Sequence, residues 1–278
     1  MTGPSQPECV PFFLDSAEHR LFALAGKPAG VAARHGILVC PAFAEEMNRT
    51  RRTVRLFCEE AAQRGMLVIA TDLHGTGDSS GDFGDARWGQ WLVDLGVAAT
   101  WLQQQGCTSI SLLGIRAGAL LAWEILRAGL IPVRSVVLWQ PVITGKAVVT
   151  DMLRARIAAA SAQGARETVS GLRQQLADGN AVEAAGYLLA PELMHALDQA
   201  VIAENPGMPL PPVCWMEIVA NEESSMRQAA LDAIKRLQAA PAAIDLVRQP
   251  DPPFWGTTEI TAGLGSVSST VRWLAGGQ

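Results

Sequence analysis

Clustered metal ligands are missing from this sequence of 278 residues. Its five cysteines form no C-x-x-C pair, and its four histidines show no H-x-x-x-H spacing and no cluster with aspartate. Metal sites commonly need such spacings, so we expect neither a metal nor a cofactor. The cysteines are scattered, several of them in apolar segments, which indicates small buried thiols in a reducing compartment.

Excess positive charge and long apolar runs are also lacking. The net charge is −5, and both signs are mixed along the chain without a basic stripe. This pattern disfavours nucleic acid and anionic membrane surfaces as partners. No segment approaches the length of a membrane-spanning helix, and Met1 to Glu8 lacks a basic segment followed by an apolar one. We therefore expect a cytoplasmic chain without a membrane span, and a homodimer is left open.

Apolar residues are abundant, at 49% of the sequence, and they fall into alternating short runs and helical stretches. Two short strands in residues 10–25 predict an antiparallel entry into a sheet. Further strands are expected at 37–40, 67–70, 110–113, 136–139, 213–219 and 243–247, and helices at 50–64, 88–105, 117–127, 225–239 and from about 259. Such alternation predicts an α/β fold with about eight strands, a mostly parallel sheet and helices on both faces.

Residues 144–204 differ in composition from the rest of the chain. They are rich in alanine, glutamine and arginine, follow a helical period and contain no convincing strand, and a proline-rich break at 205–212 comes next. We predict one domain over residues 1–278 in which 144–204 form an inserted helical cap.

The most informative motif lies at the end of the strand near residue 110. A buried strand leads into Gly114-Ile115-Arg116-Ala117-Gly118 and then into an apolar helix. This is the setting of a nucleophile elbow, G-x-S-x-G, in which a strained turn presents a serine hydroxyl above the sheet. Arg116 stands where that serine is expected. A guanidinium keeps its proton and has no lone pair with which to attack a carbonyl, so it cannot replace the serine.

These features together resemble the α/β-hydrolase fold over residues 36–273. The resemblance rests on the elbow, the cap and the loop Asp72-Leu73-His74-Gly75-Thr76-Gly77-Asp78-Ser79. More narrowly, the chain is similar to the exosortase-A-system-associated hydrolases of the type-two group. That similarity is carried by residues 41–52, residues 77–85, the G-I-R-A-G elbow and Pro253-Phe254-Trp255. It implies a place beside bacterial exopolysaccharide production and the sorting of proteins with a PEP-CTERM signal.

The resemblance also implies where the partners of a serine nucleophile belong. The acid is expected just after the strand 213–219, at Glu222 or Glu223, and the histidine in a loop after the last strand. No histidine follows residue 195. Loss of nucleophile or base alone typically removes about 10⁶ in turnover, so orthodox catalysis is disfavoured. Ser79 fits G-x-S-x-G by letters, but no apolar helix follows it, and a turn is the better interpretation.

Arg116 needs an anionic neighbour, because a cation at a helix N-terminus is disfavoured. One hypothesis is an internal salt bridge to Glu45 or Glu46. The other is an anionic ligand group held by Arg116 and nearby backbone amides. The residues that we expect around such a ligand are Phe43, Ala44, Glu45, Glu46, Arg116, Ala117 and Trp255.

Two functions follow from these alternatives. The first is an accessory or anionic-ligand-binding protein, with a small-molecule, acyl or saccharide ligand in a pocket under the cap. The second is an active hydrolase or acyl-transfer enzyme with unorthodox machinery. In that enzyme, water is activated by Glu45, Glu46 or His74, and Arg116 stabilises the oxyanion.

Overall fold

A mixed β-sheet forms the centre of the molecule. The computed structural model describes residues 6–30, 32–162, 164–202, 209–238 and 243–276. Within these residues the sheet has eight strands in the order β1-β2-β4-β3-β5-β6-β9-β10. The strands are β1 (Glu8–Ser16), β2 (His19–Lys27), β3 (His35–Cys40), β4 (Leu67–Thr71), β5 (Ser109–Ile115), β6 (Val133–Trp139), β9 (Val213–Val219) and β10 (Ile244–Pro250).

Within this sheet β2 runs opposite to the other seven strands. β1 pairs with β2 and β2 with β4 in antiparallel register, whereas all pairs from β4 to β10 are parallel. The central strands are buried on both faces, with all seven residues of β9 and six of seven in β5 buried. Continuous apolar runs are what such strands require. The predicted fold class and the antiparallel entry are confirmed.

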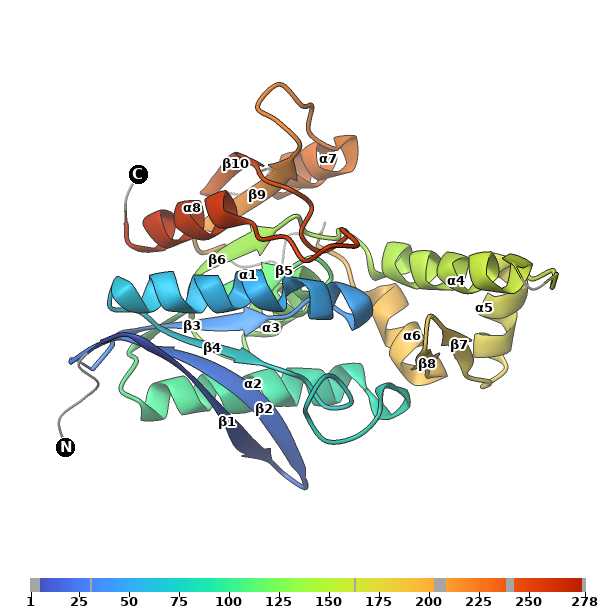
Figure 1. The fold of residues 1–278 in the computed structure, drawn as a ribbon, viewed down its shortest axis with the longest axis horizontal. Helices are drawn as coiled ribbons and strands as arrows, with labels where there is room; N and C mark the ends of the chain where they lie inside the picture. Colours follow the sequence, from blue (N-terminus) through green and yellow to red (C-terminus); the bar gives the residue numbers. More distant parts are fainter. Residues whose placement is uncertain (1–5, 31, 163, 203–208, 239–242, 277–278) are drawn as a thin grey trace.

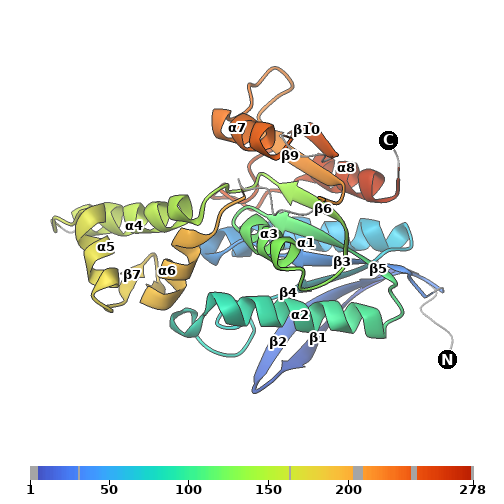
Figure 2. The ribbon, with the colours of Figure 1, turned by 180° about the vertical axis from the view of Figure 1, so that it is seen from behind.

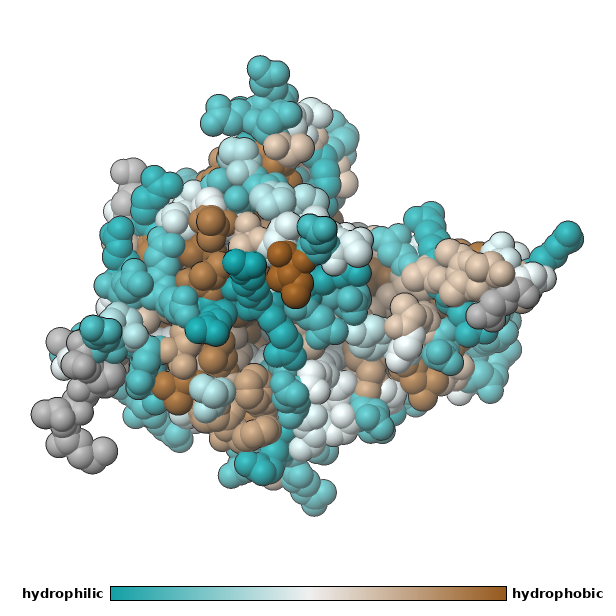
Figure 3. Space-filling view, in the orientation of Figure 1, coloured by the Kyte–Doolittle hydropathy of each residue, from teal (hydrophilic) through white to brown (hydrophobic). Residues whose placement is uncertain are grey.

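Helices cover both faces of the sheet (Figures 1 and 2). Buried side chains of α1 (Ala44–Gln63) and α8 (Leu264–Leu274) pack against one face of the sheet and form one apolar cluster with it. A second, larger cluster joins the other face to α2 (Trp88–Gln104), α3 (Gly118–Ala128) and α7 (Gln228–Leu237). A single 3-10 turn, η1 (Phe83–Asp85), precedes α2 in the described chain. Figure 3 shows mainly hydrophilic residues on the visible face, with apolar residues in small separate groups.

The segment between β6 and β9 projects from one end of the sheet (Figure 1, right). Its elements are α4 (Gly145–Ala162), α5 (Val169–Ala177), β7 (Val182–Ala184), β8 (Tyr187–Leu189) and α6 (Pro191–Gln199). The expectation that it contains no strand is wrong, because β7 and β8 form a hairpin. Its two turn residues, Ala185 and Gly186, have φ of 51° and 84°. Positive φ at both positions suits a two-residue turn.

The two ends of this segment lie together. Thr144 forms an isolated antiparallel bridge with Val201, and the amide of Gly145 donates to the carbonyl of Ala200 at 2.8 Å. Chain entry and exit at one point is what an insertion requires, so we propose residues 144–204 as a cap on a single domain. The proline-rich break predicted at 205–212 falls in part outside the described residues.

Several helix boundaries differ from the sequence-based ones. α1 begins at Ala44 instead of Thr50, and no side chain caps it. α8 begins at Leu264, five residues later than expected, because its cap is remote in sequence. The carboxylate of Asp251 accepts hydrogen bonds from the amides of Gly265 and Ser266 at 3.3 and 2.5 Å. The early start of α1 matters most, since it places three predicted ligand residues, Ala44, Glu45 and Glu46, in the first helical turn.

Candidate functional site

The elbow after β5 has the geometry that a nucleophile would need. Arg116 has φ of 53°, in the left-handed region that side chains rarely adopt. Its amide donates to Trp139 O at 3.0 Å, and its carbonyl accepts from the amide of Val142 at 3.1 Å. A Cβ on Gly118 would overlap the carbonyl oxygens of Cys40 and Pro41. The turn is therefore as tight as the G-x-S-x-G pattern predicts, although it carries a guanidinium.

The Arg116 side chain forms a bidentate ion pair with Glu46. Its Nε lies 3.1 and 3.2 Å from the two carboxylate oxygens, and its Nη2 donates to Oε1 at 3.0 Å. The exposed side-chain fractions are 18% for Arg116 and 34% for Glu46. Parallel N–H···O bonds of this kind are among the stronger polar contacts in proteins. Of the two hypotheses for Arg116, the internal salt bridge is the arrangement present in the structure.

Two further contacts hold the guanidinium in place. Nη1 donates to the carbonyl oxygen of Gln140 at 3.1 Å. The indole ring of Trp255 covers the group, with the guanidinium carbon 4.9 Å from the ring centroid. A cation over an aromatic face at this distance is attracted by the ring quadrupole. Trp255 comes from the loop after β10, which is where the resemblance places a histidine. The elbow residue is thus covered by an indole and has no imidazole beside it.

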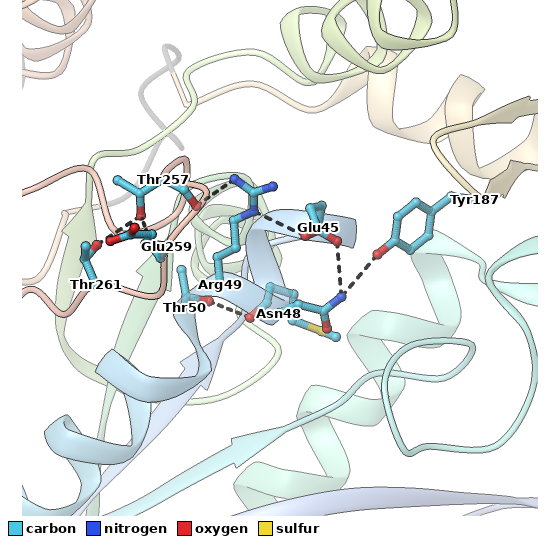
Figure 4. A network of polar contacts seen from close by, with 9 residues as sticks. Glu45, Asn48, Arg49, Thr50, Tyr187, Thr257, Glu259 and Thr261 are labelled. Atoms are coloured by element: carbon cyan, nitrogen blue, oxygen red, sulfur yellow. Dashed lines mark hydrogen bonds and ion pairs between the residues drawn. The ribbon is translucent and has the colours of Figure 1, made fainter. Parts of the chain in front are cut away.

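Glu45 faces a different set of partners from those of Glu46 (Figure 4). Arg49 donates from Nε to Glu45 at 3.2 Å and from Nη1 to the carbonyl of Thr257 at 2.8 Å. Asn48 donates to Glu45 at 3.5 Å and to the hydroxyl of Tyr187 at 3.3 Å. This network ties the first turns of α1 to the loop after β10 and to the β7–β8 hairpin.

A cavity of about 220 Å³ lies between the elbow and the proposed cap. Six of the seven predicted ligand residues line it: Phe43, Ala44, Glu45, Glu46, Arg116 and Ala117. The seventh, Trp255, does not line the cavity. Its ring packs on the guanidinium of Arg116, which does line it. The opposite wall comes from the proposed cap and is mostly apolar, with Val148, Met152, Ala155, Ala184, Ala185, Tyr187 and Leu189 beside Asp151. The structure therefore brings the predicted set together around one space.

Phe43 and Ala117 both line the cavity. Amides at these two positions, after the third strand and after the elbow residue, are those that would bind a carbonyl oxygen in an oxyanion hole. Both positions lie at the cavity, beside an elbow that carries Arg116 where a serine would stand.

The expected acid position lies away from this cavity. Glu222 and Glu223 are exposed, and neither lines the cavity. A buried acid that the sequence-based prediction did not include is Glu217, which is 1% exposed within β9. Its carboxylate accepts two hydrogen bonds from Arg227 at 2.9 and 2.6 Å and one from Trp215 Nε1 at 3.0 Å. The signal was available, since an acidic residue inside an apolar strand must have a partner.

His74 also lies outside the cavity. Its ring stacks on that of His19 with centroids 3.8 Å apart, and its amide donates to Asp94 at 2.8 Å. Burial, followed by the neighbouring His19, lowers the pKa of His74. Ser79 is buried in a turn, where its hydroxyl donates to the carbonyl of Asp72 and accepts from the amide of Phe22. Neither side chain is placed to act on a ligand beside Arg116.

In the part of the chain that the structure describes, no group of three or more histidine, cysteine, aspartate or glutamate side chains is placed to hold a metal ion. Nor does any described helix combine the length and the apolar character needed to cross a membrane.

The chain was compared with known proteins at the level of sequence and of structure. No protein-family model matches it, and no curated protein does. Similar solved structures include a soluble variant of monoglyceride lipase from Saccharomyces cerevisiae, at 12% identity, TM-score 0.64, and 100% and 97% coverage of the two chains. Est1E from Butyrivibrio proteoclasticus has 12% identity, TM-score 0.60, and 95% and 96% coverage. A proline iminopeptidase-related protein from Thermus thermophilus has 16% identity, TM-score 0.55, and 96% and 98% coverage.

These likenesses extend over nearly the whole of each chain. Together with the strand order and the elbow, they show that this chain has the α/β-hydrolase fold. They do not assign an activity, because one fold supports many chemistries.

Proposed function

We propose that this α/β-hydrolase-like chain is a ligand-binding accessory protein that does not perform serine-based acyl transfer. One observation carries the proposal. The elbow residue is Arg116, whose side chain is paired with Glu46 and covered by Trp255. An arginine held in this way can orient a ligand, but it cannot form a covalent acyl intermediate.

The cavity lining indicates what class of ligand would fit. Three carboxylates, Glu45, Glu46 and Asp151, line the cavity with a single guanidinium. An anionic ligand would have to displace Glu46 from Arg116, so this balance favours an uncharged polar group. The apolar wall favours an acyl chain or the apolar face of a saccharide. We propose an uncharged acyl or saccharide ligand whose carbonyl or hydroxyl oxygen meets the amides of Phe43 and Ala117.

The biological setting is proposed on the sequence motifs alone. The similarity to the exosortase-associated group supports a role beside exopolysaccharide production or exosortase-dependent sorting. The scattered thiols, which form no C-x-x-C pair, support a proposed cytoplasmic location. Both proposals rest on the sequence and go beyond the shared fold.

Binding can be measured by titrating the protein with a monoacylglycerol, a short saccharide, acetate and phosphate, using calorimetry and thermal shift. The proposal expects saturable binding of an uncharged ligand. Ala155→Trp should weaken it at least about tenfold, because the indole enters the cavity. Ala158→Trp is the matched control, since Ala158 is exposed on the same helix and does not line the cavity. Equal affinity in both variants would contradict the proposal.

The alternative is an active hydrolase or acyl-transfer enzyme with unorthodox machinery. It is favoured by the carboxylate of Glu46, which lies beside Arg116 and lines the same cavity as Phe43 and Ala117. In such an enzyme Glu46 activates water and Arg116 stabilises the oxyanion. Ester turnover that is abolished in Glu46→Gln and kept in Glu45→Gln would support it. No turnover of esters or glycosides by the wild-type protein would remove it.

A further inference from the structure

Two cysteines from distant parts of the chain meet beside the edge of the sheet. Cys9 is half-buried on β1, and its Sγ lies 4.0 Å from the carbonyl oxygen of Arg55 in α1. Cys58 is buried one helical turn further along α1, and the two thiols are near enough to shift each other's pKa, that of Cys9 downward and that of Cys58 upward. The two residues are separated by more than forty positions in the sequence, so the fold alone brings them together.

Backbone geometry leads to the same conclusion independently of the thiols. Cys9 is directly opposite Gly26 in the β1–β2 pair, so its side chain points to the same face as a Cβ on Gly26 would. That Cβ position lies 2.9 Å from the Cβ of Cys58. Opposite Cβ atoms in antiparallel strands are about 4.5–5.5 Å apart, and disulfides need Cβ atoms about 3.5–4.5 Å apart. These contacts place the Cβ atoms of Cys9 and Cys58 on one face within about 8 Å of each other, a range that includes the separation a disulfide needs.

The remaining cysteines lie in different surroundings. Cys40, Cys107 and Cys214 are buried. Burial raises the pKa of Cys107 to about 11, and burial with a smaller effect of Asp245 raises that of Cys214 to about 12. Such thiols stay protonated and are poor nucleophiles. Cys9 differs from these three thiols because it is only partly buried and has a second thiol, that of Cys58, beside it.

We propose that Cys9 and Cys58 form a reversible thiol modification site that closes to an intramolecular disulfide in the presence of a small disulfide oxidant of the glutathione class. This inference does not depend on the ligand or on the absence of serine catalysis.

The exchange has two steps. The Cys9 thiolate attacks one sulfur of the oxidant, whose S–S bond breaks, and the first oxidant thiolate leaves and takes up a proton. Cys58 then loses its proton to solvent and attacks the Cys9 sulfur, which releases the second oxidant thiolate. The two protein thiols are oxidised by two electrons in all, and the oxidant is reduced to two thiols.

The local environment suits these roles. The neighbouring Cys58 thiol lowers the pKa of Cys9 against the opposing effect of burial, and Cys9 is the more accessible of the two. Cys9 is therefore the attacking group. Cys58 keeps its proton until the mixed disulfide forms, because the same contact together with burial raises its pKa. The bond would fasten the edge hairpin β1–β2 to α1, the helix whose first turn carries Glu45 and Glu46.

The folded wild-type protein is incubated with oxidised glutathione, quenched in acid and digested with trypsin. We expect a cross-link between peptides 1–20 and 56–64, a fall from five free thiols to three, and a mass loss of about 2 Da without a retained glutathione. The cross-linked protein should also melt at a higher temperature, because the bond restricts the unfolded chain.

Variants separate the roles of the two thiols. Cys9→Ser should neither react quickly nor form the cross-link, whereas Cys58→Ala should stop at a stable glutathione adduct on Cys9. Cys107→Ala is the matched control and should keep the cross-link. The proposal is overturned if wild-type Cys9 becomes glutathionylated without closing onto Cys58, if it stays unmodified while other thiols react, or if cross-links join the cysteines at random. If Cys58→Ala fails to fold, the cross-link and thiol count of the wild-type protein still test the proposal.

Discussion

A single side chain, that of Arg116, separates this protein from the chemistry that its elbow is shaped for. Its positive φ places it in a conformation that costs about 1–3 kcal/mol in non-glycine residues. The hydrogen bonds to Trp139 and Val142 maintain the turn. A cation near the start of α3 is disfavoured by about 0.3–1 kcal/mol, and the carboxylate of Glu46 offsets this cost. Both the backbone conformation and the charge of Arg116 are therefore stabilised by neighbouring residues.

Removing the charge of Glu46 should destabilise the protein. Glu46→Gln leaves the mostly buried guanidinium without its counter-ion, and we expect the free energy of unfolding to fall by about 1–2 kcal/mol after allowance for partial exposure. Glu45→Gln is the matched control, because the Glu45 side chain is 57% exposed. Its loss should change stability by no more than about 0.5 kcal/mol. Urea denaturation of both variants measures the difference, and equal values would show that the Arg116–Glu46 pair contributes nothing.

Among the elements, the elbow strand and helix carry the tightest packing at the site. Gly118 begins α3 directly against the carbonyl oxygens of Cys40 and Pro41 at the end of β3. A side chain there would push α3 away from the strand. The whole position of Arg116 above the sheet depends on that close approach.

Gly118→Ala should therefore lower the free energy of unfolding by about 3 kcal/mol or more, since backbone atoms must move to accept the methyl group. Gly96→Ala is a useful counterpart within α2, because nothing lies within 4 Å of the added carbon. Alanine in a helix interior is favoured over glycine, so this change should stabilise the protein by about 0.5–1 kcal/mol. Thermal and urea unfolding of the two variants measure whether the first change destabilises the protein and the second stabilises it. A neutral Gly118→Ala would contradict the tight elbow.

Elements with strong local patterns could be predicted from the sequence, and elements fixed by distant contacts could not. β9 was predicted with correct bounds, because its apolar run is continuous and buried on both faces. The start of α8 was missed because its capping carboxylate, Asp251, precedes the helix by more than ten residues. The β7–β8 hairpin was missed because each strand has only three residues, too few to show a period.

The candidate site follows the same rule. The elbow motif located Arg116, and the topology placed Phe43, Glu46 and Ala117 beside it. The sequence left open whether Glu45 or Glu46 pairs with Arg116, since both carboxylates are in the same helical turn. Only the packing shows that Glu46 faces the elbow and that Glu45 faces Arg49.

On the scale of the whole molecule, two apolar layers enclose one sheet, and a partly buried histidine at the start of β3 makes its stability sensitive to acid. His35, at the start of β3, hydrogen-bonds through Nε2 to Ser111 at 2.8 Å. Burial, and to a smaller extent the charge of Arg134, lowers the pKa of His35 from 6.5 to about 4. The folded chain therefore keeps this imidazole neutral at pH values where the unfolded chain protonates it.

Stability should fall as the pH is lowered from 6.5 toward 4, because the unfolded chain binds a proton in that window that the folded chain does not. The contribution is fully present above pH 6.5. It amounts to about 1–2 kcal/mol once screening at this partly exposed site is allowed for. His35→Gln should flatten the pH dependence of the unfolding free energy in this range. His195→Gln, at an exposed position on α6, should not. Identical pH profiles for the wild type and His35→Gln would contradict this assignment.

Treatment of the wild-type protein with a fluorophosphonate probe, followed by intact mass measurement, tests the central claim most directly, with an active serine esterase as the positive control. These probes attach to serines that an adjacent base has activated. Because the elbow holds Arg116 and the loop after β10 offers Trp255 in place of an imidazole, the account predicts no adduct. A stoichiometric adduct on a serine of this chain, lost on heat denaturation, would contradict it.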